Sequence, residues 1–513
     1  MIGGLSKFNR CLLVGAGAIG LLAAGATGAG AQDLQEIQAQ IQQMQATIKA
    51  LEKQVQDAKA QAAAAQTAAS DSKSDIDLKV KWKGAPEFSS SDGKFKMKIR
   101  GRLQTDYNAI DQDEELTGFP DVSAAEIRRA RLGVEGVVFY NVEYKFEVDF
   151  ANDEAAIKDA YIEYTGLADG LGLIVGNFKT PNSIDEMTSS RYLTFMERAA
   201  FVEAFGLDRQ IGAGAVYATD HFTLSAGIFG PEPFDDEVWR DDVKTGAARV
   251  TWAPINRDVN GVHQVLHLGA SWRQRDGAED LRPDRDPERF DDEFFRYRAR
   301  GADLHLADRF VATPQIFDGD TFWGVEGAVI WGPWHLVGEY TQLEAEGGRG
   351  ICGADLDCFE GDQFFPGSDP TYVGWYVEAG WFITGETRSY KEGEFGAIKV
   401  KNPVLGGGKG GGWGAWQIAG RYDVIELSDK ATTFVGIRNS DEDDTLFECN
   451  QCGDQETWMV VVNWWLNDYT GLQFQYGESD IGGGSLLFPN GVSANRDNGA
   501  NIKGFGTRAR FYW

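Results

Sequence analysis

The chain has no long apolar run that could cross a membrane as a helix. Its one apolar stretch, from Cys11 to about Ala26, is diluted by glycine and alanine. It falls well below the roughly 20 apolar residues that a spanning helix needs. Histidine and cysteine are scarce, with five of each in 513 residues, and no histidine lies beside a serine-rich motif. We therefore predict no catalytic residues, no metal site and no cofactor.

Basic residues are outnumbered. The chain has 49 lysines and arginines and 78 aspartates and glutamates, which gives a net charge of −29. This balance argues against nucleic acid as a partner. Acidic loops on a membrane barrel and an ordinary acidic soluble protein would both explain it, so charge alone does not choose between them.

The first residues have the pattern of an export signal. Lys7 and Arg10 precede the apolar stretch, and Ala29-Gly30-Ala31 offers a small-x-small cleavage site. We predict a signal peptide over 1–31. An exported chain meets oxidising conditions, so the remaining cysteines are predicted to form disulfides, with zinc binding as the alternative. These cysteines are Cys352, Cys358, Cys449 and Cys452.

A different pattern covers 32–69. Apolar residues alternate spacings of three and four, as in a heptad seam, and the remaining positions are mostly Gln, Glu, Lys and Ala. The seam residues are Leu34, Ile37, Ile41, Met44, Ile48, Leu51 and Val55. We predict a coiled-coil segment, with a lone amphipathic helix as the alternative. Residues 70–93, rich in Ser, Asp, Lys and Gly, are predicted to be a linker.

From residue 94 to 513 the period becomes two, which is typical of strands. In 142–150, for example, apolar and charged residues alternate strictly. We predict strands at 94–106, 127–139, 142–151, 157–165, 171–179, 211–219, 221–229, 244–253, 262–274, 322–331, 334–344, 372–384, 413–427, 457–466, 470–477 and 502–513. Their connections mostly alternate long and short, as in a transmembrane barrel. The short 152–156 and the long 385–412 connections are exceptions. The predicted fold is all-β: a 16-stranded antiparallel transmembrane β-barrel with an N-terminal helical coiled-coil segment.

The last predicted strand ends the chain at Trp513. Phe505, Phe511 and Trp513 share one face. A terminal aromatic on an alternating strand resembles the assembly signal of bacterial outer-membrane barrels. We therefore predict the outer membrane of a Gram-negative bacterium, with its lipid, its lipopolysaccharide and the barrel-assembly machinery as partners. A closed ring is also required physically, because an unpaired edge in lipid leaves backbone groups unsatisfied.

The inner faces of several predicted strands are rich in basic residues. These are Lys96, Lys98, Arg100 and Arg102 on the first strand, Arg129 and Arg131 on the second, and Arg508 and Arg510 on the last. Arg298 and Arg300 share a face in the long 275–321 connection. Such sets select anions in pores. The alternative for any one arginine is that it only keeps the channel wet. The 180–210 connection could fold inward, with Ser190, Arg191 and Arg198 as its contacts.

Several motifs together resemble the family of phosphate-selective porins O and P. They are IRRARLGVEG at 127–136, YKFEVDFA at 144–151, VGNFKTPNSIDEMTSSRYLTFMER at 175–198 and GWYVEAGWFITGETRSYKEGEFG at 374–396. The resemblance implies a sixteen-stranded trimeric porin whose third external loop narrows a channel for small anions such as phosphate or polyphosphate.

The resemblance also implies roles for single residues. The paired arginines of the family match Arg128 and Arg129, its loop residues match Ser190 and Arg191, and its inward acid matches Asp159. Its later basic segment matches Arg298, Arg300 and His305, although Gly301 stands where proline is usual. Counting along the strand places Arg128 and Arg129 on opposite faces. Either a β-bulge brings both inward or only one lines the pore.

Three functions remain open at this point. The first is an anion channel. The second is a general small-solute porin whose coiled coil tethers the barrel to the cell envelope. The third is a barrel hydrolase, for which the scarce histidines give little support.

Overall fold

A computed structural model describes residues 31–71, 78–151, 154–230, 244–276, 295–313, 317–347, 369–406, 411–429, 453–482 and 499–513. Two units are distinguished, 1–77 and 78–513. The predicted signal peptide, apart from Ala31, and the four candidate disulfide cysteines lie outside the described residues.

The first unit contains one helix, α1 (Ala31–Asp71), which confirms that the heptad region is helical. Its seam is uncovered in the single chain, since Met44, Ile48, Leu51 and Val55 are each more than half exposed. The coiled coil itself stays a prediction. Among the helices described, none has the length and apolar character to cross a bilayer.

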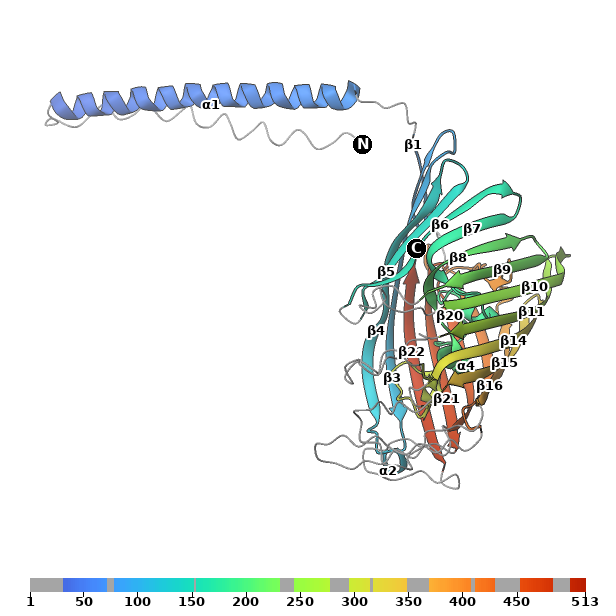
Figure 1. The fold of residues 1–513 in the computed structure, drawn as a ribbon. Helices are drawn as coiled ribbons and strands as arrows, with labels where there is room; N and C mark the ends of the chain where they lie inside the picture. The colour runs from blue at the N-terminus through green and yellow to red at the C-terminus, as the bar shows by residue number, and fades with distance from the viewer. Residues whose placement is uncertain are drawn as a thin grey trace, which may run out of the picture. The chain divides into compact units, whose positions relative to one another are not determined.

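The second unit is a closed antiparallel β-barrel (Figure 1). Sixteen strands form its ring. Each strand pairs with its neighbour, and the last pairs with the first. The strands are β3 (Lys96–Asp111), β4 (Val122–Val138), β5 (Val142–Asp149), β6 (Ala156–Ala168), β7 (Leu171–Lys179), β8 (Arg209–Ala218), β9 (Phe222–Phe229), β10 (Lys244–Val259), β11 (Val262–Asp276), β14 (Phe317–Trp331), β15 (Trp334–Gly347), β16 (Thr371–Phe382), β19 (Ala415–Glu426), β20 (Asp454–Trp465), β21 (Thr470–Gly482) and β22 (Ala500–Tyr512). All sixteen predicted strands are confirmed.

The period of two sorts the side chains of the barrel wall. Phe146, Ile162 and Val175 point outward and are 45–58% exposed. Polar side chains such as Gln473 and Gln475 point inward and are buried. This apolar-out, polar-in order is the reverse of a soluble core and fits a wall that faces lipid.

The closing strand β22 has the faces that the sequence predicted. Phe505 and Phe511 are exposed on the outside, while Arg508 and Arg510 are buried inside. Trp513 continues the ladder, because its N–H donates to the Gly101 carbonyl at 3.1 Å and its carbonyl accepts from the Gly101 N–H. The two ends of the barrel sequence are thereby joined, which leaves no open edge in lipid.

The predicted linker over 70–93 needs a correction. Its later part forms a hairpin of β1 (Leu78–Lys83) and β2 (Ala85–Ser90), and β2 pairs with the start of β3. Gly84 makes the reversal possible because its φ of 76° lies in the region that glycine adopts without strain. Alternating apolar and lysine residues in LKVKWK supply a strand pattern that the linker prediction did not use.

Parts of three connections fold into the barrel. The first, 180–208, contains α3 (Ile184–Met187) and α4 (Ala200–Phe205). The second, 295–313, contains β12 (Arg298–Ala299), η4 (Gly301–Asp303) and β13 (Val311–Ala312). The third, 383–414, contains β17 (Tyr390–Lys391) and β18 (Glu394–Phe395). The inward folding of 180–210 is thus confirmed, and the exceptional 385–412 connection is explained. A short α2 (Glu114–Thr117) follows β3.

Buried wall side chains hold these segments in place. Asn463 donates to the Thr194 carbonyl at 2.8 Å, and Ser479 accepts from the Ala302 N–H at 2.7 Å. Arg249 donates to the Gly393 carbonyl at 2.8 Å. Aromatic rings of the segments pack against wall residues, so the hydrophobic core of this barrel lies inside it, including Phe201, Phe205, Tyr297, Phe310 and Tyr376.

Candidate functional site

A cavity of about 820 Å³ lies between the inward segment 180–208 and the wall formed by β3–β9. Twelve lysines and arginines line it, against nine aspartates and glutamates. The basic residues are Arg100, Arg102, Arg128, Arg129, Arg131, Lys145, Lys158, Lys179, Arg191, Arg198, Arg209 and Arg300. The cavity is therefore more basic than the chain as a whole, which carries a net charge of −29.

The paired arginines reach the cavity through a β-bulge. The register of β3 and β4 pairs Gln104 with Arg129 and Thr105 with Ile127, which leaves Arg128 as the extra residue. A bulge of this kind turns two successive side chains to one side. Both guanidiniums line the cavity. The bulge interpretation is confirmed, and the interpretation that only one arginine lines the pore is wrong.

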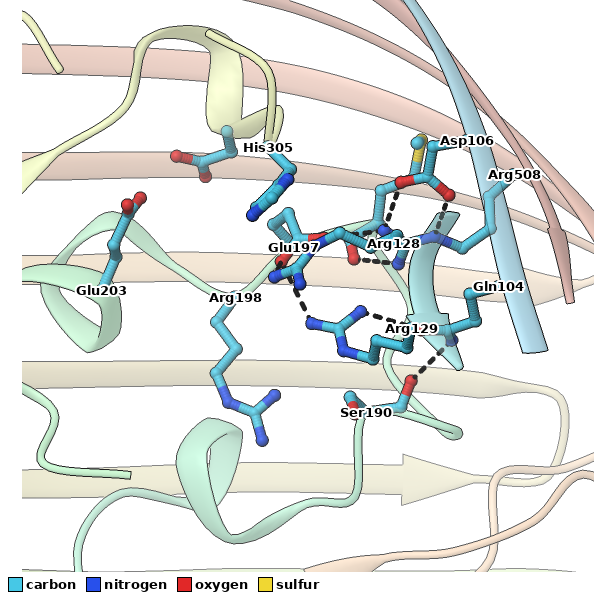
Figure 2. A network of polar contacts seen from close by, with 12 residues as sticks. Gln104, Asp106, Arg128, Arg129, Ser190, Glu197, Arg198, Glu203, His305 and Arg508 are labelled. Atoms are coloured by element: carbon cyan, nitrogen blue, oxygen red, sulfur yellow. Dashed lines mark hydrogen bonds and ion pairs between the residues drawn. The ribbon is translucent and has the colours of Figure 1, made fainter. Parts of the chain in front are cut away.

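Glu197 of the inward segment binds both arginines (Figure 2). Arg128 donates through Nε and Nη2 to the two carboxylate oxygens, at 2.9 Å each, and Arg129 Nη2 donates to Oε2 at 3.3 Å. Burial alone would raise the pKa of Glu197, but the surrounding arginines hold this pKa well below its usual range. Glu197 therefore stays ionised, and it neutralises part of the basic wall.

Arg508 joins the same carboxylate from the closing strand. Its Nη2 donates to Glu197 at 2.6 Å, and its Nε and Nη2 donate to the two oxygens of Asp106 at 2.7 and 2.6 Å. Arg508 is 1% exposed and does not line the cavity. Its position indicates an anchor for the inward segment rather than a contact for permeating ions.

Ser190 and Arg191 lie against the first strand. The Ser190 hydroxyl accepts a hydrogen bond from Arg102, and its carbonyl accepts one from Gln104 at 3.3 Å. Arg191 donates to the Ser189 hydroxyl at 3.3 Å and lies over the Tyr192 ring. In the described ranges no carboxylate lies within 4.0 Å of Arg191. This guanidinium faces the cavity, and no described residue supplies a counter-ion for it.

Most other predicted residues of the wall are paired with acids. Asp159 accepts from Arg209 at 2.8 Å and from Lys145 at 2.7 Å. Arg131 contacts Glu147 at 3.1 Å and Asp149 at 2.6 Å. Arg100 pairs with Glu135.

The basic residues of the inward segments are paired in the same way. Arg198 contacts Glu186 at 3.0 Å, and Arg300 pairs with Glu203. The cavity is thus lined by both basic and acidic side chains, and the basic ones are more numerous.

Besides Arg508, four predicted residues do not line the cavity. Lys96 and Lys98 lie at the start of β3, where β2 pairs with it. Arg298, on β12, is also not among the residues that line the cavity. Arg510 is buried and is also not among the residues that line the cavity. Conversely, the site prediction missed Arg209, which precedes the predicted strand by two residues. Only its contact with Asp159, 50 residues away, reveals its role.

Metal ligands do not converge in the described ranges, where no group of three or more His, Cys, Asp or Glu residues is arranged to hold an ion. His305 lines the cavity and contacts Glu126 at 2.8 Å. The arrangement can therefore guide charged solutes by electrostatic attraction.

Comparison with known proteins gives a consistent picture. Residues 97–481 match the family described as phosphate-selective porin O and P. An uncharacterized protein of Caulobacter vibrioides is 29% identical over 432 residues, which cover 83% of this chain and 76% of that protein. Porin O of Pseudomonas aeruginosa is 28% identical over 440 residues, which cover 78% of this chain and 86% of that porin.

Solved outer-membrane channels also match, with low sequence identity. The channel DcaP of Acinetobacter baumannii has a TM-score of 0.45 at 14% identity, with 83% of this chain and 99% of that chain covered. An anion-selective porin from Comamonas acidovorans has a TM-score of 0.44 at 11% identity, with 82% and 100% covered.

Proposed function

This chain belongs to the phosphate-selective porin O and P family, and we propose that its channel carries small anions, phosphate among them, by passive diffusion. The protein is an outer-membrane porin, a channel rather than an enzyme. The substrate preference is the part that we infer from the residues of the lumen.

The excess of basic over acidic residues around the cavity supports this proposal. Arg102, Arg128, Arg129 and Arg191 come from two strands and one inward segment, and they meet at the same cavity. Low-dielectric walls focus the field of such groups and raise the local concentration of ions of opposite charge. Anions should therefore enter more readily than cations, although the protein as a whole repels them.

The ion pairs make the preference moderate. Glu197 occupies Arg128 and Arg129, and Asp149 and Glu147 occupy Arg131. Tight recognition of phosphate needs guanidinium forks that are free to donate two parallel hydrogen bonds. Arg191 is the cavity arginine that best meets this requirement. We therefore expect general anion preference with weak phosphate binding, which leaves small neutral solutes as further cargo.

Planar-bilayer recordings test the proposal. The purified porin in a potassium chloride gradient should give a reversal potential of the sign expected for chloride permeation. A potential of the opposite sign would refute anion preference. Millimolar phosphate added to the chloride solution should then reduce the current, whereas an unchanged current would limit the proposal to general anion diffusion.

We further propose that the chain assembles as a homotrimer and that α1 contributes to assembly. The seam on α1 has a face of apolar side chains that a single chain leaves exposed. Burying such a face against a second helix is the usual way to stabilise a heptad pattern. The same helix could also tether the barrel to the cell envelope.

A further inference from the structure

The hairpin of β1 and β2 presents an apolar face that is largely exposed. Leu78, Val80 and Trp82 alternate along β1 and are 54%, 58% and 73% exposed. Single exposed apolar residues are common on proteins, but a contiguous group usually marks a surface that another molecule covers. The position of the hairpin on the barrel identifies the class of that molecule.

The strand register places this apolar face on the outer side of the barrel wall. Val80 lies opposite Phe88 of β2, and Phe88 lies opposite Met97 of β3. The same row continues across β4 and β5 to Ile162 of β6, which points outward. Directly paired residues share one face of a sheet, and so do alternate residues of one strand. The apolar face of β1 therefore continues the lipid-facing surface of the barrel.

The hairpin also fills a step in the rim of the barrel. The ladder between β22 and β3 ends where Trp513 pairs with Gly101, whereas β4 stays paired with β3 as far as Lys96. On the β22 side, β2 pairs with this remaining stretch of β3 and covers its backbone edge. The turn of the hairpin lies against the β20–β21 connection, since a Cβ on Gly84 would collide with the Tyr469 ring.

This part of the rim has the features of a membrane–water boundary. Short connections such as 466–469, between β20 and β21, mark the periplasmic end of an outer-membrane barrel. Beside the hairpin, Lys94 Nζ lies 5.5 Å from the ring centre of Phe95 and 5.3 Å from that of Phe139. Aromatic rings and lysines are typical anchors where lipid chains meet water. The hairpin therefore lies at the boundary between the periplasmic leaflet and water.

The opposite face of β1 is basic in a strongly acidic protein. Lys79 and Lys81 alternate with the apolar residues, and both are exposed. The sequence of β1, LKVKWK, contains no acid, although the chain carries a net charge of −29. An apolar face backed by a basic one is the composition of elements that lie on anionic membranes, where each lysine near the surface strengthens binding.

We propose that the β1–β2 hairpin is a membrane anchor that rests on the periplasmic leaflet of the outer membrane. Trp82 and Val80 insert among the lipid chains, and Lys79 and Lys81 favour phospholipids with an anionic headgroup. Lysines on an edge strand also disfavour pairing with a strand of a second copy. The anchor does not depend on which solute the channel carries, so its tests are independent of the proposed function.

Coverage of the β3 edge alone is the competing explanation for the hairpin. A hairpin with only this role needs the pairing between β2 and β3, but it needs no apolar side chains on the outer face of β1. It would also show no preference among lipid headgroups. Lipid contact at Trp82 and selectivity for anionic lipid therefore separate the two explanations.

Photo-crosslinking in vesicles is the first test. The full-length porin, with p-benzoylphenylalanine in place of Trp82, is reconstituted in vesicles of phosphatidylcholine and phosphatidylglycerol, illuminated, and digested for mass spectrometry. Peptides from 78–90 should carry lipid adducts several times more often than with the same label in place of Lys81, because successive side chains of a strand point to opposite faces. Equal labelling from the two positions, or a covalent dimer in place of lipid adducts, would overturn the anchor.

Headgroup preference is the second test, with the label again in place of Trp82. In vesicles with equal amounts of the two lipids, phosphatidylglycerol adducts should exceed phosphatidylcholine adducts by about threefold, since lysines near the surface attract anionic lipid. Lys79→Gln with Lys81→Gln should bring this ratio close to one. Lys503→Gln is the control, because Lys503 pairs with Asp111 at the other end of β3 and should leave the ratio unchanged. Equal adducts in the parent, or an unchanged ratio in the double variant, would contradict the proposal.

Val80 offers a second position for the label, because it lies on the same face as Trp82 and is also more than half exposed. If replacement of Trp82 prevents assembly, adducts from the label in place of Val80 decide the question. Absence of lipid adducts from both positions in the assembled protein would overturn the anchor.

Discussion

Arg128 holds Glu197 through two parallel hydrogen bonds of 2.9 Å, so a carboxylate of the chain itself occupies one of the guanidinium forks of the constriction. Arg129 and Arg508 contact the same carboxylate. The geometry is the one that a permeating oxyanion would adopt. Glu197 therefore competes with the cargo for the most basic part of the wall.

Replacing Glu197 with Gln should make the channel more anion-selective. The amide keeps the shape of the side chain but releases a negative charge from three arginines, so the chloride-to-potassium permeability ratio should rise by about twofold or more. Reversal potentials measure this ratio. Glu154→Gln is the comparison: Glu154 lines the same cavity but has no ion pair among the described residues, so its replacement frees no arginine and should raise the ratio less than Glu197→Gln. A ratio that stays unchanged or falls in Glu197→Gln would contradict the competition.

Breaking the Arg508–Asp106 pair should destabilise the barrel. Both residues are at most 2% exposed, and removing one partner of a buried pair leaves an uncompensated charge at a cost of about 3–5 kcal/mol. Arg508→Met and Asp106→Asn should each lower the midpoint of denaturant unfolding, followed by tryptophan fluorescence. The double variant should lose less than the two single losses combined.

An exposed pair on the same strand provides the comparison. Lys503 lies 4.0 Å from Glu478 and is about half exposed. Lys503→Met should cost only about 0–1 kcal/mol. If the Arg508 and Lys503 variants unfold at the same midpoint, the anchor role of Arg508 is refuted.

Stability should depend on pH through Asp303 of the second inward segment. Burial, and then the neighbouring Asp423, raise the pKa of Asp303 well above its usual value of 3.8. Above pH 3.8 the unfolded chain has lost this proton while the folded barrel keeps it, so Asp303 lowers stability as the pH rises toward its folded pKa. Below pH 3.8 both states bind the proton, and the effect disappears.

Asp303→Asn should remove this dependence of stability on pH. Thermal unfolding midpoints at pH 4, 6 and 8 should fall in the parent protein and change less in the variant, with the variant more stable at pH 8. A variant that is less stable than the parent at pH 8 would instead show that the ionised Asp303 carboxylate stabilises the folded barrel. Asp308→Asn, in the same segment but partly exposed, serves as the matched control.

The seam of α1 should contribute to assembly. Ile48→Ser together with Leu51→Ser removes two apolar residues from the seam, and we expect a smaller trimer fraction in detergent, measured by light scattering. Lys49→Ser with Glu52→Ser changes neighbouring positions outside the seam and should leave the fraction unchanged. A variant lacking 32–75 that remains fully trimeric would show that the seam is not needed.

The strands could be predicted from the sequence because a barrel wall imposes one period on every strand. Their ends were less certain. β4 begins at Val122, five residues before the predicted start. The prediction missed this first part of the strand because Ala124 and Ala125 give no clear alternation of polarity. The hairpin at 78–90 was missed for a related reason, since short strands amid Ser, Asp and Gly resemble a linker.

The site was predictable only in part. Basic side chains on inner faces could be counted, but their partners could not. Arg508 and Asp106 are 402 residues apart, and only closure of the ring brings them together. The face of Arg128 depended on a bulge, which is a property of the pairing between β3 and β4 rather than of either strand alone.

The aromatic core inside the barrel has an electrical consequence. Phe201, Phe205, Tyr297 and Tyr376 occupy part of the lumen with material that excludes water and ions. We infer that ions pass on the side next to β3–β9, where the cavity lies. Most of a voltage applied across the outer membrane should therefore drop along this narrow strip, so a charge change on its wall should act on permeation far more strongly than the same change elsewhere in the barrel.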